Sequence, residues 1–352
     1  MGLLRNFGVL FRRSARAVQP VSTELSKGIA QTVQHVRSAL KDVGSTADAP
    51  AARRSSANTV DEGRFVCRPY RNQAGERSYK LYVPSSYSLS SRPLPLIVML
   101  HGCTQSPDDF ANGTRMNELA EAHGFIVIYP AQDAGANPSR CWNWFRPDDQ
   151  RHGEGEPAII AGMTRQVVDE LELDARRVYV AGMSAGGAMA VTLGQTYPKT
   201  FAAVGCHSGL AYAAAHDVAS AFRAMRNGSG VEAPVECDGD VRCIPTIVFH
   251  GKADAKVAPQ NGLDVVEQAL RCQAESYPHP VNVRSGKDAN GRRYRQTIYF
   301  DASERSVVEH WALEGLGHAW SGGSSEGSNT DPHGVDASSE MVQFFLRHSL
   351  TQ

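Results

Sequence analysis

The chain has 352 residues, of which 41% are hydrophobic and 8% aromatic, a composition that suits one large packed domain or two ordinary ones. Its 36 Lys and Arg residues balance 37 Asp and Glu residues, so the formal net charge is −1. This balance argues against a nucleic-acid-binding protein, which usually carries a basic surplus, and it favours a neutral or weakly charged binding partner.

The first 60 residues differ in composition from the rest of the chain. Residues 1–17 combine four arginines with apolar side chains on one side of a helical wheel. This pattern fits either a short amphipathic helix on a membrane or hydrophobic granule, or a simple basic tail. Residues 22–41 have apolar positions at helical spacing, and residues 45–58 are typical of a flexible linker. We therefore expect an N-terminal basic amphipathic segment and linker over residues 1–60, and one folded domain over residues 61–352.

From residue 64 onward, the sequence pattern alternates between strands and helices. We expect strands over residues 64–70, 78–83, 94–100, 125–129, 177–181, 201–206, 246–249, 296–300 and 307–313. We expect a helix after Ser106 and further helices over residues 158–171, 185–193, 257–272 and 338–348, with a long loop over 130–155. This alternation predicts an α/β fold with a mostly parallel central sheet and helices on both faces. In such sheets, functional sites lie beyond the carboxyl ends of the strands.

The clearest chemical signal is Gly-Met-Ser-Ala-Gly at residues 182–186, between an expected strand and an expected helix. A G-x-S-x-G sequence at such a junction places the serine on a tight turn, because glycines on either side avoid clashes of Cβ atoms. The helix that follows directs free N–H groups toward a developing oxyanion. Ser184 is therefore the candidate nucleophile, and a purely structural turn is the alternative.

A serine nucleophile needs a base to accept its proton, and in this arrangement an acid and then a histidine follow in the chain. Asp254 comes just after the expected strand 246–249, where a carboxylate can orient an imidazole; it can instead cap the next helix. Asp264 is a weaker candidate. His318 follows the last expected strand on a glycine-flanked loop and is the candidate base, while His333 on the same late loop is a further option.

An oxyanion hole needs two hydrogen-bond donors. The candidates are the backbone amide of Ala185, directly after the serine, and that of Cys103, just after the expected strand 94–100. Cys103 as a nucleophile is a rival interpretation, but no cationic partner or helix N-terminus is evident for it.

Trp142 and Trp144 lie on the long loop over the same edge of the sheet, and Trp320 lies close to His318 in the sequence. Tryptophans on a loop are typical of a binding cleft, so we expect all three to contact substrate. The alternative is that they pack the base of the loop.

The seven cysteines include no C-x-x-C pair, which argues against a zinc ribbon, a redox motif or a disulfide-rich scaffold. One or two disulfides fit this number, and an odd count leaves at least one cysteine without an intrachain partner.

Taken in order, five segments resemble the polyhydroxybutyrate depolymerase family of esterases, which is related to feruloyl and acetylxylan esterases. The segments are LHGCTQSPDDFA, CWNWF, YVAGMSAGGAMA, HGKADAKVAP and GHAWSGGS followed by TDPHGVDAS. The resemblance covers residues 64–350. It implies an α/β-hydrolase fold and ester hydrolysis without metal or cofactor, with Ser184, Asp254 and His318 in the triad roles. It also implies a disulfide between Cys103 and Cys141.

We therefore expect a serine carboxylester hydrolase that cleaves hydroxyalkanoate polyesters or their oligomers through an acyl-enzyme. The alternatives are a feruloyl-type, acetylxylan-type or general short-chain carboxylesterase, and a peptidase or amidase is chemically possible with the same triad. A non-catalytic α/β-hydrolase-like binding protein is a different class, against which the complete triad argues.

The expected partners are an ester substrate and, through residues 1–17, a hydrophobic granule or membrane surface, but no nucleic acid. The resemblance implies an extracellular protein. Because the N-terminal segment lacks the apolar core and cleavage site of a secretory signal, the cytoplasm or a granule surface is the alternative location.

Overall fold

The structure is a computed structural model, and it describes residues 63–229, 244–271 and 281–351. The chain divides into two units, residues 1–58 and 59–352, and all described residues belong to the second. The expected amphipathic segment, N-terminal helix and linker lie outside the described residues. Within the described part, no helix combines the length and apolar content that a membrane span requires.

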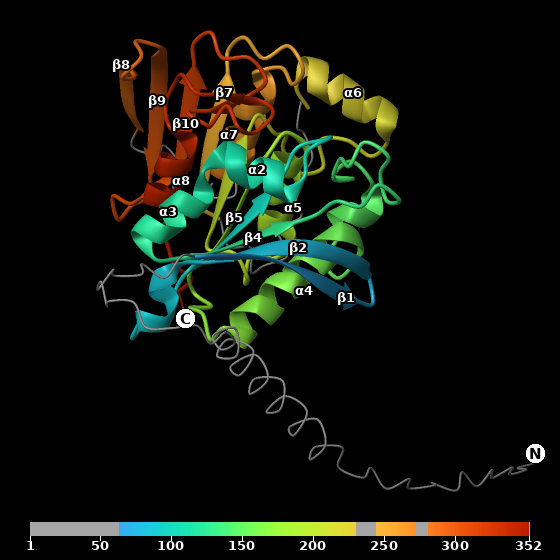
Figure 1. Cartoon of the computed structure of the whole chain (residues 1–352). Helices are drawn as coiled ribbons and strands as arrows, with labels where there is room; N and C mark the ends of the chain where they lie inside the picture. Colours follow the sequence, from blue (N-terminus) through green and yellow to red (C-terminus); the bar gives the residue numbers. More distant parts are fainter. Residues whose placement is uncertain (1–62, 230–243, 272–280, 352) are drawn as a thin grey trace, which may run out of the picture. The chain divides into compact units, whose positions relative to one another are not determined.

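Strands and helices alternate through much of this unit (Figure 1). The strands are β1 (Arg64–Asn72), β2 (Gly75–Val83), β3 (Leu96–Leu100), β4 (Ile126–Pro130), β5 (Val178–Met183), β6 (Ala203–His207), β7 (Thr246–Gly251), β8 (Val281–Lys287), β9 (Arg293–Phe300), β10 (Ser306–Leu313), β11 (Trp320–Ser321) and β12 (Thr330–Asp331). The helices are α2 (Pro107–Thr114), α3 (Met116–His123), α4 (Gly155–Glu170), α5 (Ala185–Thr196), α6 (Val218–Asn227), α7 (Gln260–Arg271) and α8 (Ala337–Phe345), with short 3-10 helices η1 (Ser85–Leu89) and η2 (Pro147–Gln150).

Ten strands of the described ranges form one mixed sheet in the order β1-β2-β4-β3-β5-β6-β7-β10-β9-β8. Neighbouring strands from β4 to β10 are parallel, and antiparallel pairs extend the sheet at both edges. The central strands β3, β5, β6 and β7 are buried along their whole length, which explains their largely apolar sequences. The expected α/β fold with a largely parallel sheet is confirmed.

Helices pack on both faces of the sheet and divide its core in two (Figure 1). Apolar side chains of α4, α5 and α7 form one hydrophobic cluster with one face of the strands. Those of α2, α3 and α8 form a second cluster with the other face. The loops at the carboxyl ends of the parallel strands are thereby held on a rigid, two-sided scaffold.

Besides the short elements η1, η2, β11 and β12, three features differ from the expected elements. The single helix expected after Ser106 is two helices, because Arg115 adopts a φ of 53° in the left-handed region between α2 and α3. Helix α6 and strand β8 were not expected. Both leave large apolar side chains exposed, such as Phe222 of α6 and Val283 of β8, and α6 buries only Ala221 and Ala224. Their large apolar residues therefore do not mark a buried face in the sequence.

Candidate active site

Ser184 occupies the turn between β5 and α5. Its backbone has φ 56° and ψ −121°, a conformation that residues with a side chain rarely adopt. Every other residue from Val178 to Gly194 is buried, whereas Ser184 is partly exposed. Its amide donates a hydrogen bond of 2.9 Å to the carbonyl oxygen of His207 at the end of β6. The strained turn therefore presents one hydroxyl group from an otherwise buried strand and helix.

Gly182 and Gly186 allow this turn to close. A Cβ atom on Gly182 would overlap the backbone of Gly186, and a Cβ atom on Gly186 would overlap the carbonyl oxygen of Leu100 on β3. The G-x-S-x-G spacing thus marks two positions where the backbone approaches too closely for any side chain.

Asp254 and His318 lie on loops that follow the neighbouring strands β7 and β10. The Nδ1 atom of His318 is 2.7 Å from Oδ2 of Asp254. The other carboxylate oxygen, Oδ1, accepts the amide hydrogens of Lys256 and Val257, both at 2.9 Å. Because an ionised carboxylate can only accept, Nδ1 of His318 carries the proton and Nε2 is left able to accept one. The structure therefore brings the expected acid and base into direct contact.

The Asp254 side chain is fully buried, yet its charge is compensated. Burial raises the pKa of this carboxyl group, but the hydrogen bond and charge of His318, together with the Val257 amide, outweigh burial and hold the pKa below its ordinary value. The carboxylate is ionised at neutral pH and holds the imidazole in one orientation. It is not the N-cap of α7, which begins only at Gln260.

The other candidates for acid and base have different partners. The carboxylate of Asp264 accepts hydrogen bonds from Ser229 and Gln260, and it thereby links α7 to the residues that follow α6. His333 is largely exposed, and its Nδ1 lies 3.5 Å from Oδ1 of Asp331.

His207 was not singled out from the sequence, but it connects the nucleophile turn to the histidine loop. Its carbonyl oxygen accepts the Ser184 amide hydrogen, and its Nε2 accepts the amide hydrogen of Ser321 at 3.1 Å. The imidazole is fully buried and stacks on Phe249 and Trp320. Burial lowers the pKa of His207 to about 3, and nearby imidazoles add to the effect. The sequence feature that could have indicated this role is the position of His207 at the end of β6, the strand beside β5.

The loop after β3 borders Ser184. A Cβ atom on Gly102 would lie 3.7 Å from the Cβ atom of Ser184. The next residue, Cys103, forms a disulfide with Cys141, which confirms the pairing implied by the resemblance. The amide of Ala185 opens α5 and has no partner within that helix. Among the described residues, no hydrogen bond uses the Cys103 amide, so both expected oxyanion donors are available.

The three tryptophans lie in the hydrophobic core instead of on an open cleft. Trp142, Trp144 and Trp320 expose 0%, 5% and 1% of their surface. The ring of Trp142 packs 5.6 Å from that of His101, and the Trp320 indole donates a hydrogen bond to Ser338. This burial corrects the expectation of substrate contact: such large rings stabilise the fold most when they leave water, and here they support the site loops from beneath.

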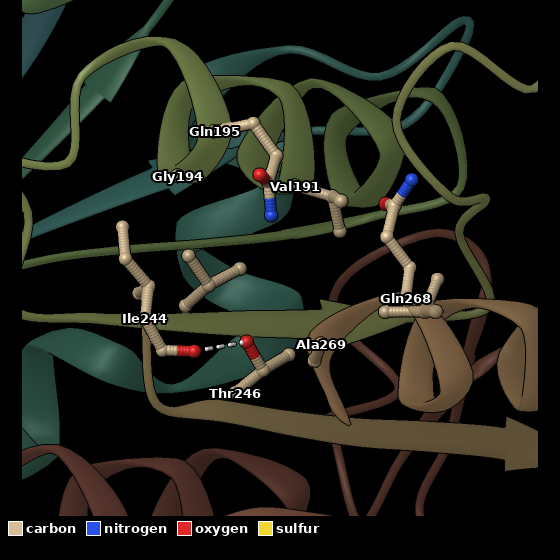
Figure 2. A pocket seen from close by; sticks show the side chains of 9 residues that line it. Val191, Gly194, Gln195, Ile244, Thr246, Gln268 and Ala269 are labelled. Atoms are coloured by element: carbon tan, nitrogen blue, oxygen red, sulfur yellow. Dashed lines mark hydrogen bonds between the residues drawn. The ribbon is translucent and has the colours of Figure 1, made fainter. Parts of the chain in front are cut away.

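Figure 2 shows the side chains that line a small pocket, which lies at the other end of the strands from Ser184. Its lining includes Val204 and Thr246, near the amino ends of β6 and β7, whereas Ser184 and Asp254 follow the carboxyl ends of their strands. The pocket has room for about one water molecule. It is therefore separate from the candidate active site.

A largely parallel sheet between two layers of helices, a serine on a strained strand-to-helix turn, and an aspartate and a histidine on later loops define an α/β-hydrolase. The family model described as "Esterase PHB depolymerase" matches residues 77–280. The chain belongs to this polyhydroxybutyrate depolymerase family of carboxylic ester hydrolases, which confirms the resemblance noted in its sequence.

The names of curated relatives in this family refer to different esters. The chain is 32% identical over 247 residues to poly(3-hydroxyalkanoate) depolymerase C of Paucimonas lemoignei, a match that covers 67% of this chain and 57% of the relative. It is 31% identical over 254 residues to feruloyl esterase B of Neurospora crassa, covering 67% of this chain and 81% of the relative. The chain thus spans little more than half of the depolymerase but most of the feruloyl esterase.

Among solved structures, an acetyl xylan esterase from Aspergillus awamori superposes with a TM-score of 0.61. The match has 21% sequence identity and covers 76% of this chain and 93% of that chain. At this level of identity, the similarity concerns the fold.

Proposed function

We propose that this protein hydrolyses carboxylic esters through a covalent acyl-enzyme, with Ser184 as nucleophile, His318 as general base and Asp254 as the group that orients it. The observation that carries the proposal is the 2.7 Å hydrogen bond between His318 Nδ1 and Asp254, because it places the single proton of a neutral imidazole on Nδ1 and so directs the lone pair to Nε2. The strained backbone of Ser184 supports the same assignment.

In the first half of the reaction, His318 Nε2 accepts the Ser184 hydroxyl proton as the oxygen attacks the ester carbonyl carbon. The backbone amides of Ala185 and Cys103 stabilise the oxyanion that forms. The bond to the alcohol oxygen then breaks, and the alcohol leaves with the proton from His318. Water attacks the acyl-enzyme by the same route, which releases the carboxylic acid and restores the serine.

For the substrate, we propose a short-chain hydroxyalkanoate polyester or its oligomers. The name of the Paucimonas lemoignei relative supports this choice, and a net charge near zero suits a neutral polymer. The second candidate is an aryl or acetyl ester on plant polysaccharide. This second candidate is favoured by the match to feruloyl esterase B, which covers 81% of that relative, whereas the match to the depolymerase covers 57%.

A matched substrate panel tests both proposals. Amorphous polyhydroxybutyrate, methyl ferulate and p-nitrophenyl butyrate are each incubated with the wild-type protein and with Ser184→Ala. We expect the wild type to clear the polymer and to cleave p-nitrophenyl butyrate, and we expect the variant to lose several orders of magnitude in kcat. Turnover of methyl ferulate without polymer clearing would favour the second candidate. Activity of the variant close to that of wild type would reject Ser184 as nucleophile.

We further propose that residues 1–17 hold the protein on a hydrophobic granule or membrane surface. The basis is the apolar stripe of this segment beside its four arginines. Co-sedimentation with polyhydroxybutyrate granules would compare the wild-type chain with a Leu4→Asp/Phe7→Asp variant. Equal pelleting of the two proteins would reject this role.

A further inference from the structure

His250 is a buried residue of β7 that lies four positions before the proposed acid, Asp254. Its side chain is 2% exposed. Its Nε2 atom lies 2.9 Å from the carbonyl oxygen of Val257, on the loop that carries Asp254, and 3.6 Å from Oδ2 of Asp254 itself. The strand that leads into the acid loop therefore contacts this loop a second time, through the imidazole of His250.

The contact with Val257 defines which nitrogen of His250 carries the proton. Because a carbonyl oxygen can only accept, Nε2 donates this hydrogen bond and holds the proton of the neutral ring. Nδ1 is then unprotonated, and it has no hydrogen-bond partner among the described residues. Burial lowers the pKa of His250 and outweighs the Val257 hydrogen bond and the Asp254 charge, which act in the opposite direction. The ring is therefore a neutral hydrogen-bond donor around neutral pH.

Val257 connects His250 to the carboxylate of Asp254, because both of its backbone polar groups are bonded. Its carbonyl oxygen accepts from His250, and its amide donates to Oδ1 of Asp254 at 2.9 Å. The amide of Lys256 donates to the same oxygen. With Oδ1 held in this way, Oδ2 faces His318 Nδ1 at 2.7 Å. A shift of the Val257 backbone would therefore turn the carboxylate relative to His318.

Helix α7 packs closely against the imidazole of His250. A Cβ atom on Gly262 would lie 2.7 Å from Nδ1 and 3.0 Å from the Cβ atom of His250. Glycine is unfavourable inside a helix, so its presence at this position fits the need for space beside the ring. The ring is thus held between the backbone of α7 and the Val257 carbonyl, which leaves it little freedom to turn away from its hydrogen-bond partner.

We propose that His250 is a positioning residue for the acid of the triad, which holds the Val257 backbone so that Oδ2 of Asp254 faces His318. This inference rests on the proposed function, since that proposal assigns the roles of Asp254 and His318. His250 acts through Val257 and does not itself contact the reacting atoms. Its contribution to turnover is therefore separate from the space that its ring fills beneath the loop.

Two substitutions of similar length separate the hydrogen bond from the filling of space. In His250→Gln, the amide nitrogen can take roughly the position of Nε2 and donate to Val257, whereas His250→Met fills the site without a donor. With p-nitrophenyl butyrate, we expect His250→Met to lower kcat by about 10- to 100-fold with KM changed by less than about threefold, because a misplaced acid acts mainly on the transition state. We expect His250→Gln to retain kcat within about fivefold of wild type. An unchanged kcat in His250→Met would overturn the proposal, as would a loss that His250→Gln shares in full.

A substitution in α7 tests the same contact without changing His250. Gly262→Ala should press on the imidazole and lower kcat, because the new methyl group overlaps the ring. In a His250→Met background, where the hydrogen bond to Val257 is already lost, we expect Gly262→Ala to lower kcat further by less than about twofold. An equal effect of Gly262→Ala in the two backgrounds would overturn the proposal, since it would show that the helix acts on turnover by another route.

Proton spectra give a readout that is independent of turnover. The Nδ1 proton of His318, which is hydrogen-bonded to Asp254, should give a low-field ¹H signal at pH 7 that disappears in His318→Gln. We expect this signal to be retained in His250→Gln and to be shifted or lost in His250→Met. An unchanged signal in His250→Met would overturn the proposal, because it would show that the carboxylate stays in place without His250.

The tautomer of His250 can also be measured in the wild-type protein. With ¹⁵N-labelled histidine, and with the His250 signals assigned by their loss in His250→Gln or His250→Met, we expect a protonated Nε2 and an unprotonated Nδ1 at pH 7. A proton on Nδ1 in place of Nε2 would overturn the proposal even if Gly262→Ala failed to fold. Failure of the proposed function is distinct, because it would appear as ester hydrolysis that persists in Ser184→Ala.

Discussion

The carbonyl oxygen of His207 accepts the amide hydrogen of Ser184, while the imidazole of the same residue accepts the amide hydrogen of Ser321. One residue at the end of β6 therefore contacts both the turn of the proposed nucleophile and the loop of the proposed base. His101, just after β3, makes comparable contacts on the oxyanion side of the site. Buried neutral imidazoles thus support the site from two neighbouring regions of the sheet.

Glycine at position 184 should give an inactive protein that is more stable than the corresponding alanine variant. The φ of 56° and ψ of −121° cost a residue with a Cβ atom on the order of 1–2 kcal/mol, part of which glycine regains. We expect Ser184→Gly to exceed Ser184→Ala in free energy of unfolding by about 1 kcal/mol, measured by urea denaturation. Both variants lack the hydroxyl group, so the alanine variant is the matched control. A glycine variant less stable than the alanine variant would contradict the presence of strain.

Replacement of the proposed acid should lower turnover without loss of the fold. We expect Asp254→Asn to lower kcat by about 10³- to 10⁴-fold, because a side-chain amide no longer holds the His318 proton on Nδ1. Asp264→Asn is the matched control, since this second buried carboxylate bonds Ser229 and Gln260, and it should keep kcat close to that of wild type. Steady-state kinetics with p-nitrophenyl butyrate would measure both. Similar losses in the two variants would argue against a specific role for Asp254.

The buried histidines should make the protein less stable in mild acid. Burial lowers the pKa of His101 and His310 to about 4 and that of His207 to about 3. In the unfolded chain, each takes up a proton as the pH falls through about 6.5, whereas in the folded protein each does so only near its lower pKa. Stability should therefore decrease between about pH 6.5 and pH 4, and each group should contribute roughly 2 kcal/mol of that loss by pH 5.

A single variant isolates one of these groups. The pKa of Glu156 is raised by its burial, and this carboxyl group acts on stability in the opposite direction, so the total pH dependence alone is ambiguous. His207→Gln keeps an acceptor for the Ser321 amide but has no group that titrates. Its loss of unfolding free energy from pH 7 to pH 5 should be smaller than that of wild type by roughly 2 kcal/mol. Identical losses in the two proteins would contradict a neutral, buried His207.

Removal of the disulfide should reduce both stability and turnover. Cys103 and Cys141 are separated by 38 positions, and opening a loop of this size is expected to lower the free energy of unfolding by about 2–4 kcal/mol. Turnover should fall as well, because the bridge holds the loop of the proposed oxyanion donor. The test is a Cys103→Ala/Cys141→Ala variant, studied by urea denaturation and kinetics. Cys67→Ala, at an exposed free cysteine, is the control, and equal stability of the two variants would contradict the prediction.

Much of the fold could be predicted because its signals are local. The buried strands β3, β5 and β7 are largely apolar, and the glycines on either side of Ser184 stand where the backbone approaches too closely for a side chain. Helix α6 and strand β8 escaped prediction because large apolar side chains, such as Phe222 of α6 and Val283 of β8, are exposed and do not mark a buried face. Helix α6 buries only two small residues, Ala221 and Ala224. The break between α2 and α3 depends on the left-handed backbone of Arg115. Such a conformation is usually marked in a sequence by glycine, and here the residue is an arginine.

By itself, the sequence determined the turn at Ser184, because this turn depends on the glycines next to it in the chain. It also determined the order in which an acid and a histidine follow, because each comes after the end of a later strand. Only the tertiary structure decided that Trp142 and Trp320 are core residues and that His101 and His207 are hydrogen-bonded supports. The hydrogen bonds of these two histidines join residues 31 and 114 positions apart. Burial and hydrogen bonding over such separations arise only when distant loops meet at the carboxyl edge of the sheet, and no local pattern encodes that meeting.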